Sequence, residues 1–94
     1  MQIVLLKFGK NKSLAPKYME AHNKWIQQGF DDGVFHCVGS LDIGGGFILV
    51  HGCGLEETKD RVKSDPFVVN NIVDVEINNI DVKRTSSDMA YLSS

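Results

Sequence analysis

The sequence predicts an α+β fold in which two helices lie on one face of a four-stranded antiparallel sheet. Residues 3–6 and 47–50 are apolar at consecutive positions, as in strands that are covered on both faces. Residues 73–77 alternate apolar and polar side chains, as in a strand with one wet face. Helical patterns over residues 14–30 and 55–64, and a further strand between them, complete the order βαββαβ, which is that of the ferredoxin-like fold.

The first strand is expected over residues 2–8 and the first helix over about residues 14–30. Ser13 is a suitable N-cap for this helix, and Pro16 falls in its first turn, where the missing N–H of proline costs nothing. His22 lies on or beside the apolar stripe of the helix, so it is either a satisfied core histidine or a group held for chemistry. The stripe itself consists of Met19, Trp25 or Ile26, Gly29 and Phe30.

Residues 34–40 are rich in β-branched and aromatic side chains, which indicates the second strand. Three consecutive glycines at residues 44–46 then lead into the third strand. Oriented backbone amides in such a turn can bind a phosphate, but a phosphate-binding loop opens a helix after a strand, whereas this turn connects two strands. The pattern therefore favours a glycine-rich hairpin.

The second helix, over about residues 55–64, has acidic residues in its first turn, where they interact favourably with the helix dipole. Asp65 should end it, because proline disfavours helical geometry in the residue before it, while Pro66 can begin a new turn. Asp65 is then either a simple cap of that turn or a carboxylate held for chemistry. The fourth strand follows over residues 72–80.

Right-handed crossovers place the first and third strands at the centre of the sheet. These two strands are the ones with continuous apolar runs, although the helices can cover only one face of the sheet. A second copy of the chain is the simplest cover for the other face. The sequence therefore predicts a homodimer packed sheet to sheet.

Length and composition limit the classes of function. Ninety-four residues make one domain, and the net charge of −2 gives no basic footprint for nucleic acid. No apolar run approaches the ~20 residues of a membrane span, and no signal peptide is recognisable, so a cytoplasmic protein is expected. Cys37 and Cys53 lack metal-ligand spacing and are expected to be reduced and partly buried. We expect neither a metal nor a cofactor, since the sequence shows no ligand set and no nucleotide fingerprint.

The topology brings several loops to one end of the sheet. There the first strand ends, the first helix begins, the second strand ends and the second helix ends. His22, Asp65, residues 39–40 and residues 44–46 should therefore lie close together. A carboxylate that orients an imidazole makes an acid/base group that works near neutral pH. The convergence predicts a catalytic pair of His22 and Asp65.

The same residues suggest a family. The features that suggest it are Ala21-His22, the strand between Gly33 and Gly39, the glycine turn before residues 47–49, Leu55-Glu56-Glu57 and Asp65-Pro66-Phe67. With them, the chain resembles the YCII-related (YciI-like) domain over about residues 2–82. The resemblance implies a dimeric α+β barrel of ferredoxin-like subunits, with an active site built on His22 and Asp65. It also implies acid/base chemistry on small, often aromatic or hydroxylated molecules, including dehydrohalogenation. Many members carry Gly-Pro after the second strand, where this chain has Gly39-Ser40.

Two hypotheses follow for the function. The first is a small cofactor-independent enzyme, in which His22 is the general acid or base and Asp65 orients it. Its substrate, a small molecule, would be bound by Gly39, Ser40, Pro66 and Phe67. The alternative is a non-catalytic dimeric module that binds a small ligand or a partner, because one fold supports many functions. A cavity with both His22 and Asp65 at its wall favours the enzyme, and an Asp65 that only caps the turn favours the module.

The chain is expected to divide into a domain over residues 1–82 and a C-terminal tail over residues 83–94. The start of the tail is polar and typical of solvated chain. Met89, Tyr91 and Leu92 are apolar enough to dock, and packing onto the dimer partner or a neighbouring molecule is favoured over a catalytic lid.

Overall fold

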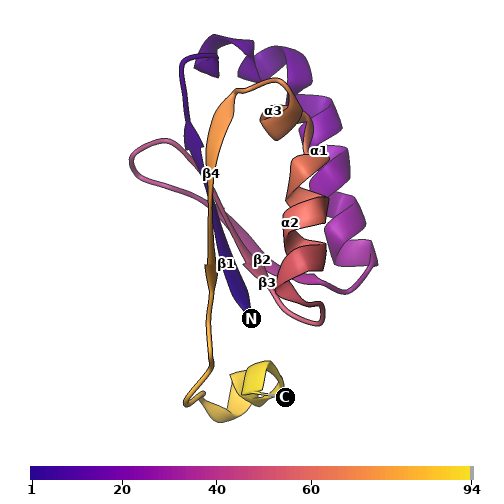
Figure 1. The fold of residues 1–94 in the computed structure, drawn as a ribbon, viewed down its shortest axis with the longest axis vertical. Helices are drawn as coiled ribbons and strands as arrows, with labels where there is room; N and C mark the ends of the chain where they lie inside the picture. The colour runs from indigo at the N-terminus through magenta and orange to yellow at the C-terminus, as the bar shows by residue number, and fades with distance from the viewer. Residues whose placement is uncertain (94) are drawn as a thin grey trace.

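An antiparallel sheet of four strands lies against helices on one face in the computed structural model, which describes residues 1–93 (Figure 1). The strand order is β2-β3-β1-β4, so β1 and β3 are central and the predicted ferredoxin-like fold class is confirmed. Most bounds fall within one or two residues of the predicted ones. The elements are β1 (Gln2–Phe8), the 3₁₀ helix η1 (Lys12–Leu14), α1 (Ala15–Asp31), β2 (Phe35–Ser40), β3 (Gly45–Val50), α2 (Leu55–Lys63), α3 (Pro66–Val69), β4 (Val73–Asn79) and the 3₁₀ helix η2 (Ser87–Ser93).

The apolar residues of β1 are consecutive because this strand lies at the centre of the sheet and has side chains on both of its faces. Val4 pairs with Ile48 of β3 and with Ile77 of β4, and both Val4 and Ile48 are buried in the core beneath the helices. Ile3 and Leu5 point to the opposite face, because side chains alternate along a strand, and they are half-buried. In Figure 1, α1, α2 and α3 all lie on the other side of the sheet and leave that face uncovered. Its cover by a second copy of the chain stays a prediction.

The start of α1 differs from the prediction. The N-cap is Leu14, which makes no side-chain capping bond, so the assignment of Ser13 as N-cap is wrong. The reason is that η1 runs directly into the helix, which places Ser13 inside the 3₁₀ turn instead of at the helix boundary. Pro16 does fall in the first turn, as expected.

Two glycines allow the sheet to form close to other backbone and side-chain atoms. A Cβ on Gly29, near the end of α1, would lie 2.1 Å from Cδ2 of Phe35, so only glycine lets α1 approach β2 there. Gly45, at the start of β3, has φ of +105°, and a Cβ there would lie 2.0 Å from the carbonyl oxygen of Leu6. The turn before β3 is therefore the predicted glycine-rich hairpin.

The tail packs on its own chain. Leu92, within η2, is only 5% exposed. The ring of Tyr91 lies 5.4 Å from the ring of His36 and 5.9 Å from that of His51, beside the start of β2 and the end of β3. Tyr91 thus contacts its own domain at this end of the sheet, where η2 lies in Figure 1, and the expectation that the tail docks on a partner subunit stays a prediction.

The two cysteines differ in exposure. Cys53 is half-buried, but Cys37 is exposed, because it lies on the face of β2 turned away from the helices. Neither thiol forms a disulfide.

Within residues 1–93, no three potential ligands among His, Cys, Asp and Glu cluster as a metal site would require. No helix in that range combines the length and the apolar character needed to cross a membrane.

Candidate active site

His22 and Asp65 meet in the structure although 43 positions separate them in the sequence. Nδ1 of His22 lies 2.7 Å from Oδ1 of Asp65. The side chain of Asp65 is fully buried and that of His22 is 12% exposed. His22 comes from the second turn of α1, whereas Asp65 lies between α2 and α3, so the packing of these helices brings the pair together.

Asp65 is also the N-cap of α3. The same oxygen, Oδ1, accepts a hydrogen bond from the backbone N–H of Phe67 at 3.1 Å. Asp65 therefore caps the turn, as the first alternative requires, and the capping oxygen also contacts His22. The other oxygen, Oδ2, is buried and makes no hydrogen bond to any described residue. All hydrogen bonds that hold this carboxylate thus converge on one atom.

The imidazole of His22 is held on its face as well as at its edge. Its ring stacks on that of Phe67, with centroids 3.9 Å apart and planes 5° from parallel, and Phe67 is itself buried. Because an ionised carboxylate only accepts hydrogen bonds, Nδ1 donates the proton in this contact. In the neutral ring Nε2 is then the basic nitrogen. No described residue is hydrogen-bonded to Nε2, so this atom is free to meet a ligand.

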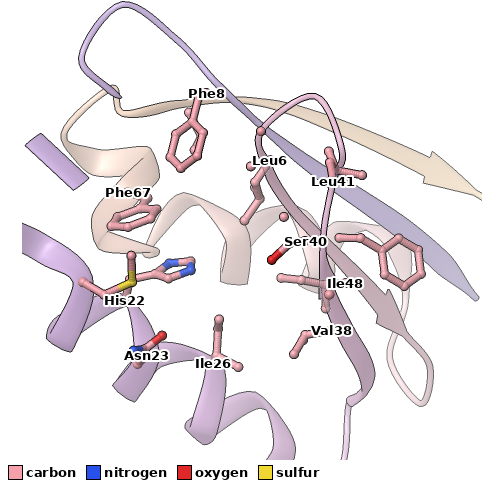
Figure 2. Close-up of a pocket in the computed structure, with 17 residues that line it drawn as sticks. Leu6, Phe8, His22, Asn23, Ile26, Val38, Ser40, Leu41, Ile48 and Phe67 are labelled. Atoms are coloured by element: carbon pink, nitrogen blue, oxygen red, sulfur yellow. The ribbon is translucent and has the colours of Figure 1, made fainter. Parts of the chain in front are cut away.

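The ring of His22 forms part of the wall of a cavity of about 440 Å³ (Figure 2). The cavity lies between α1 and the end of the sheet where β1 and β2 finish and β3 begins. Its volume falls within the range of ordinary small-molecule sites. Its wall is mostly apolar, and no charged Lys, Arg, Asp or Glu of the described residues lines it. The lining residues are Leu6, Phe8, Met19, His22, Asn23, Ile26, Val38, Gly39, Ser40, Leu41, Gly44, Gly45, Gly46, Phe47, Ile48, Phe67 and Val73.

The structure places the other predicted site residues in two groups. Gly39, Ser40 and Phe67 line the cavity, as do the glycines of the hairpin. Asp65 and Pro66 do not line it within the described part of the chain. Asp65 contacts the cavity only through His22, because its side chain turns toward the first amides of α3. The expectation that both members of the pair stand at the wall is therefore met by His22 and not by Asp65.

Sequence reasoning missed Asn23. Its amide lines the cavity beside His22 and makes no hydrogen bond to any described residue (Figure 2). Asn23 lies outside the apolar stripe of α1, so the periodicity gave no signal for it. Met19 was assigned to the stripe and is 40% exposed, because it borders the open cavity and not the filled core. A polar residue next to the stripe histidine, on the helix turn that faces the glycine hairpin, is the signal that could have indicated Asn23.

Comparisons with known proteins find a likeness in structure but none in sequence. No protein-family model matches it, and no curated protein matches it in sequence. Among solved structures, it resembles the 5-chloro-2-hydroxyhydroquinone dehydrochlorinase (TftG) from Burkholderia phenoliruptrix AC1100, whose structure holds 2,5-dihydroxybenzoquinone. The TM-score is 0.69 at 13% sequence identity, over 85% of this chain and 93% of that one. At this identity, the likeness establishes a shared fold.

Proposed function

We propose that the chain is a small enzyme that transfers a proton to or from a small molecule, with His22 as the acid/base group. The observation that carries the proposal is the 2.7 Å contact between Nδ1 of His22 and the buried carboxylate of Asp65, with the ring of His22 at a cavity wall. A histidine that only packs in the core is not expected to line a cavity while contacting a fully buried carboxylate.

The geometry supports a division of roles within the pair. Nε2 of His22 accepts a proton from the substrate, and the carboxylate of Asp65 stabilises the imidazolium that forms while holding the ring in place. Such a positioned base accelerates proton transfer about 10²–10⁴-fold. In an elimination of the dehydrohalogenase type, the proton passes to Nε2 and the halide leaves with its bonding electron pair. The chain's own residues supply these roles without a cofactor.

The cavity wall suggests the class of substrate. Its apolar surface suits a single aromatic or quinone-like ring, and its volume of about 440 Å³ accommodates one. Ser40 and Asn23 offer a hydroxyl and an amide to oxygen substituents on such a ring. Since no lysine or arginine of the described residues lines the wall, a substrate carrying a carboxylate or phosphate would lose hydration without gaining a cationic side chain of this kind. We therefore expect an uncharged hydroxylated substrate.

Membership of the YCII-related family is part of this proposal, as is the role of residues 1–82 as the catalytic domain. The shared fold with a dehydrochlorinase and the meeting of His22 with Asp65 support it. The proposed homodimer would pack the uncovered sheet faces together. Ile3, Leu5 and Leu49 lie on this face, and their apolar character supports a protein partner there.

The alternative function is a non-catalytic dimeric module that binds a small ligand. One observation favours it, namely that Asp65 caps α3 through the same oxygen that contacts His22. Capping alone is enough to account for an aspartate at this position, without any chemistry. The two functions differ in whether a bound ligand is changed.

The test is turnover of a panel of halogenated and plain hydroquinones and phenols, followed by mass spectrometry and halide release. His22→Gln and Asp65→Asn keep polar side chains of similar size, and His51→Gln is the matched control, because His51 lies away from the cavity. We expect turnover by the wild type and by His51→Gln, with losses of about 10²–10⁴ in the other two variants. Full turnover by both His22→Gln and Asp65→Asn would disprove the catalytic pair. Saturable binding without any turnover would establish the module instead.

A further inference from the structure

We propose that Trp25 and Ser64 are positioning residues that hold the His22–Asp65 pair in register. Nε1 of Trp25 donates to the carbonyl oxygen of Arg61 at 3.1 Å and to Oγ of Ser64 at 3.2 Å. Trp25 follows His22 by one helical turn on α1, and Ser64 directly precedes Asp65. The contact between Trp25 and Ser64 therefore joins the same two segments as the contact between His22 and Asp65. The proposal rests on the proposed function only for its effect on turnover.

The indole N–H donates at the C-terminal end of α2, where backbone carbonyls lack partners within the helix. The last carbonyls of α2, which ends at Lys63, have no partner within the helix. The carbonyl of Arg61 is one of them, and it accepts from the backbone N–H and the hydroxyl of Ser64 as well as from the indole. A donor from α1 thus fixes the end of α2, the point from which the chain continues directly into Asp65.

The indole ring is itself held in place, and it contacts both His22 and the segment just before Asp65. It lies beside the ring of His22, with centroids 6.1 Å apart, and edge-on to the buried ring of Phe35 at 5.2 Å. One side chain therefore packs next to the histidine and determines where the aspartate segment begins. Neither Trp25 nor Ser64 lines the cavity in the described part of the chain, so both would act through the pair and not on a ligand.

This second contact matters because Asp65 has little freedom to adjust. Among the described residues, Oδ1 alone of its two oxygens has hydrogen-bond partners, and it is shared between His22 and the amide of Phe67. A shift of the end of α2 by a fraction of an ångström would force that oxygen to give up one of its two partners. A misplacement of about 1 Å far from the reacting atoms can cost about 10²-fold in rate.

The experiment compares Trp25→Phe and Ser64→Ala with Thr58→Val in the full-length chain. Trp25→Phe keeps an aromatic ring and removes the N–H, and Ser64→Ala removes one of its two acceptors. Thr58→Val is the matched control, because Thr58 is buried on the same helix, near its other end, and donates a hydrogen bond to Gln2 at 2.9 Å. The readout is the proton NMR signal of the His22 Nδ1–H, assigned by its loss in His22→Gln.

We expect the wild type to show a resolved, slowly exchanging Nδ1–H signal, as a buried hydrogen bond to a carboxylate requires. The signal should broaden or vanish in Trp25→Phe, weaken in Ser64→Ala, return in Ser64→Thr, and persist in Thr58→Val. Where a substrate is known, kcat of Trp25→Phe should fall by about 10- to 100-fold with KM unchanged.

An unchanged signal in Trp25→Phe would overturn the proposal. So would an equal loss in Thr58→Val, because the effect would then reflect a general loosening of α2. Failure of the proposed function would look different. In that case the signal would follow the predicted series of variants, while His22→Gln would leave turnover or ligand binding untouched.

Discussion

Asp65 performs two structural roles through one oxygen, and substitutions can separate them. Oδ1 caps α3 at Phe67 and also contacts His22, while Oδ2 is buried without a partner among the described residues. Asp65→Ser keeps a side-chain oxygen that can cap, because serine caps helices about as well as aspartate, but its shorter side chain cannot reach His22. Asp65→Ala removes both contacts. The difference between these two variants therefore measures the cap alone.

The expected free energies of unfolding follow from the three interactions. The cap contributes about 1 kcal/mol, within a range of about 0.5–2 kcal/mol. The hydrogen bond between the carboxylate and His22 contributes about 1.5–3 kcal/mol, and the unpaired buried oxygen costs about 1–3 kcal/mol, so these two largely cancel. Both variants also leave Nδ1 of His22 without its acceptor, which costs about 1–3 kcal/mol. Asp65→Ser should then be about 1–3 kcal/mol less stable than the wild type, and Asp65→Ala about 1 kcal/mol below Asp65→Ser.

Thermal and urea unfolding followed by circular dichroism measure this difference. For a domain of this length, about 1 kcal/mol corresponds to roughly 4–8 °C in Tm. The serine variant should therefore melt about 4–8 °C above the alanine variant. Equal melting of the two variants would show that Asp65 does not cap α3 in solution. A loss of more than about 3 kcal/mol in both would show that the contact with His22 mainly stabilises the fold.

Two further predictions concern other parts of the chain. Sedimentation velocity should show a dimer for the wild type and a monomer for Leu5→Arg, because Leu5 lies on the sheet face that α1, α2 and α3 leave uncovered. A wild-type monomer would contradict the sheet-to-sheet interface. Burial raises the pKa of the Cys53 thiol, so less thiolate forms near neutral pH. Iodoacetamide should therefore alkylate Cys53 more slowly in the folded protein than in urea, and equal rates by mass spectrometry would contradict this.

The order and type of the elements could be predicted because they depend on local patterns. Continuous apolar runs in β1 and β3 marked the central strands, and Asp65-Pro66 marked the end of α2, since proline restricts the residue before it. The start of α1 could not be predicted as well. The η1 turn before it satisfies the entering backbone, so the position of Ser13 carried no reliable signal.

The sequence by itself determined that His22 and Asp65 lie at the same end of the sheet, because the connection order requires it. Only the tertiary structure decided that Asp65 lies behind His22 and uses a single oxygen for two partners. It also decided that Asn23 and Ser40 line the cavity and that Asp65 does not. The physical reason is that periodicity reports which face of an element is buried. The direction of each side chain within that face depends on how the helices pack against one another.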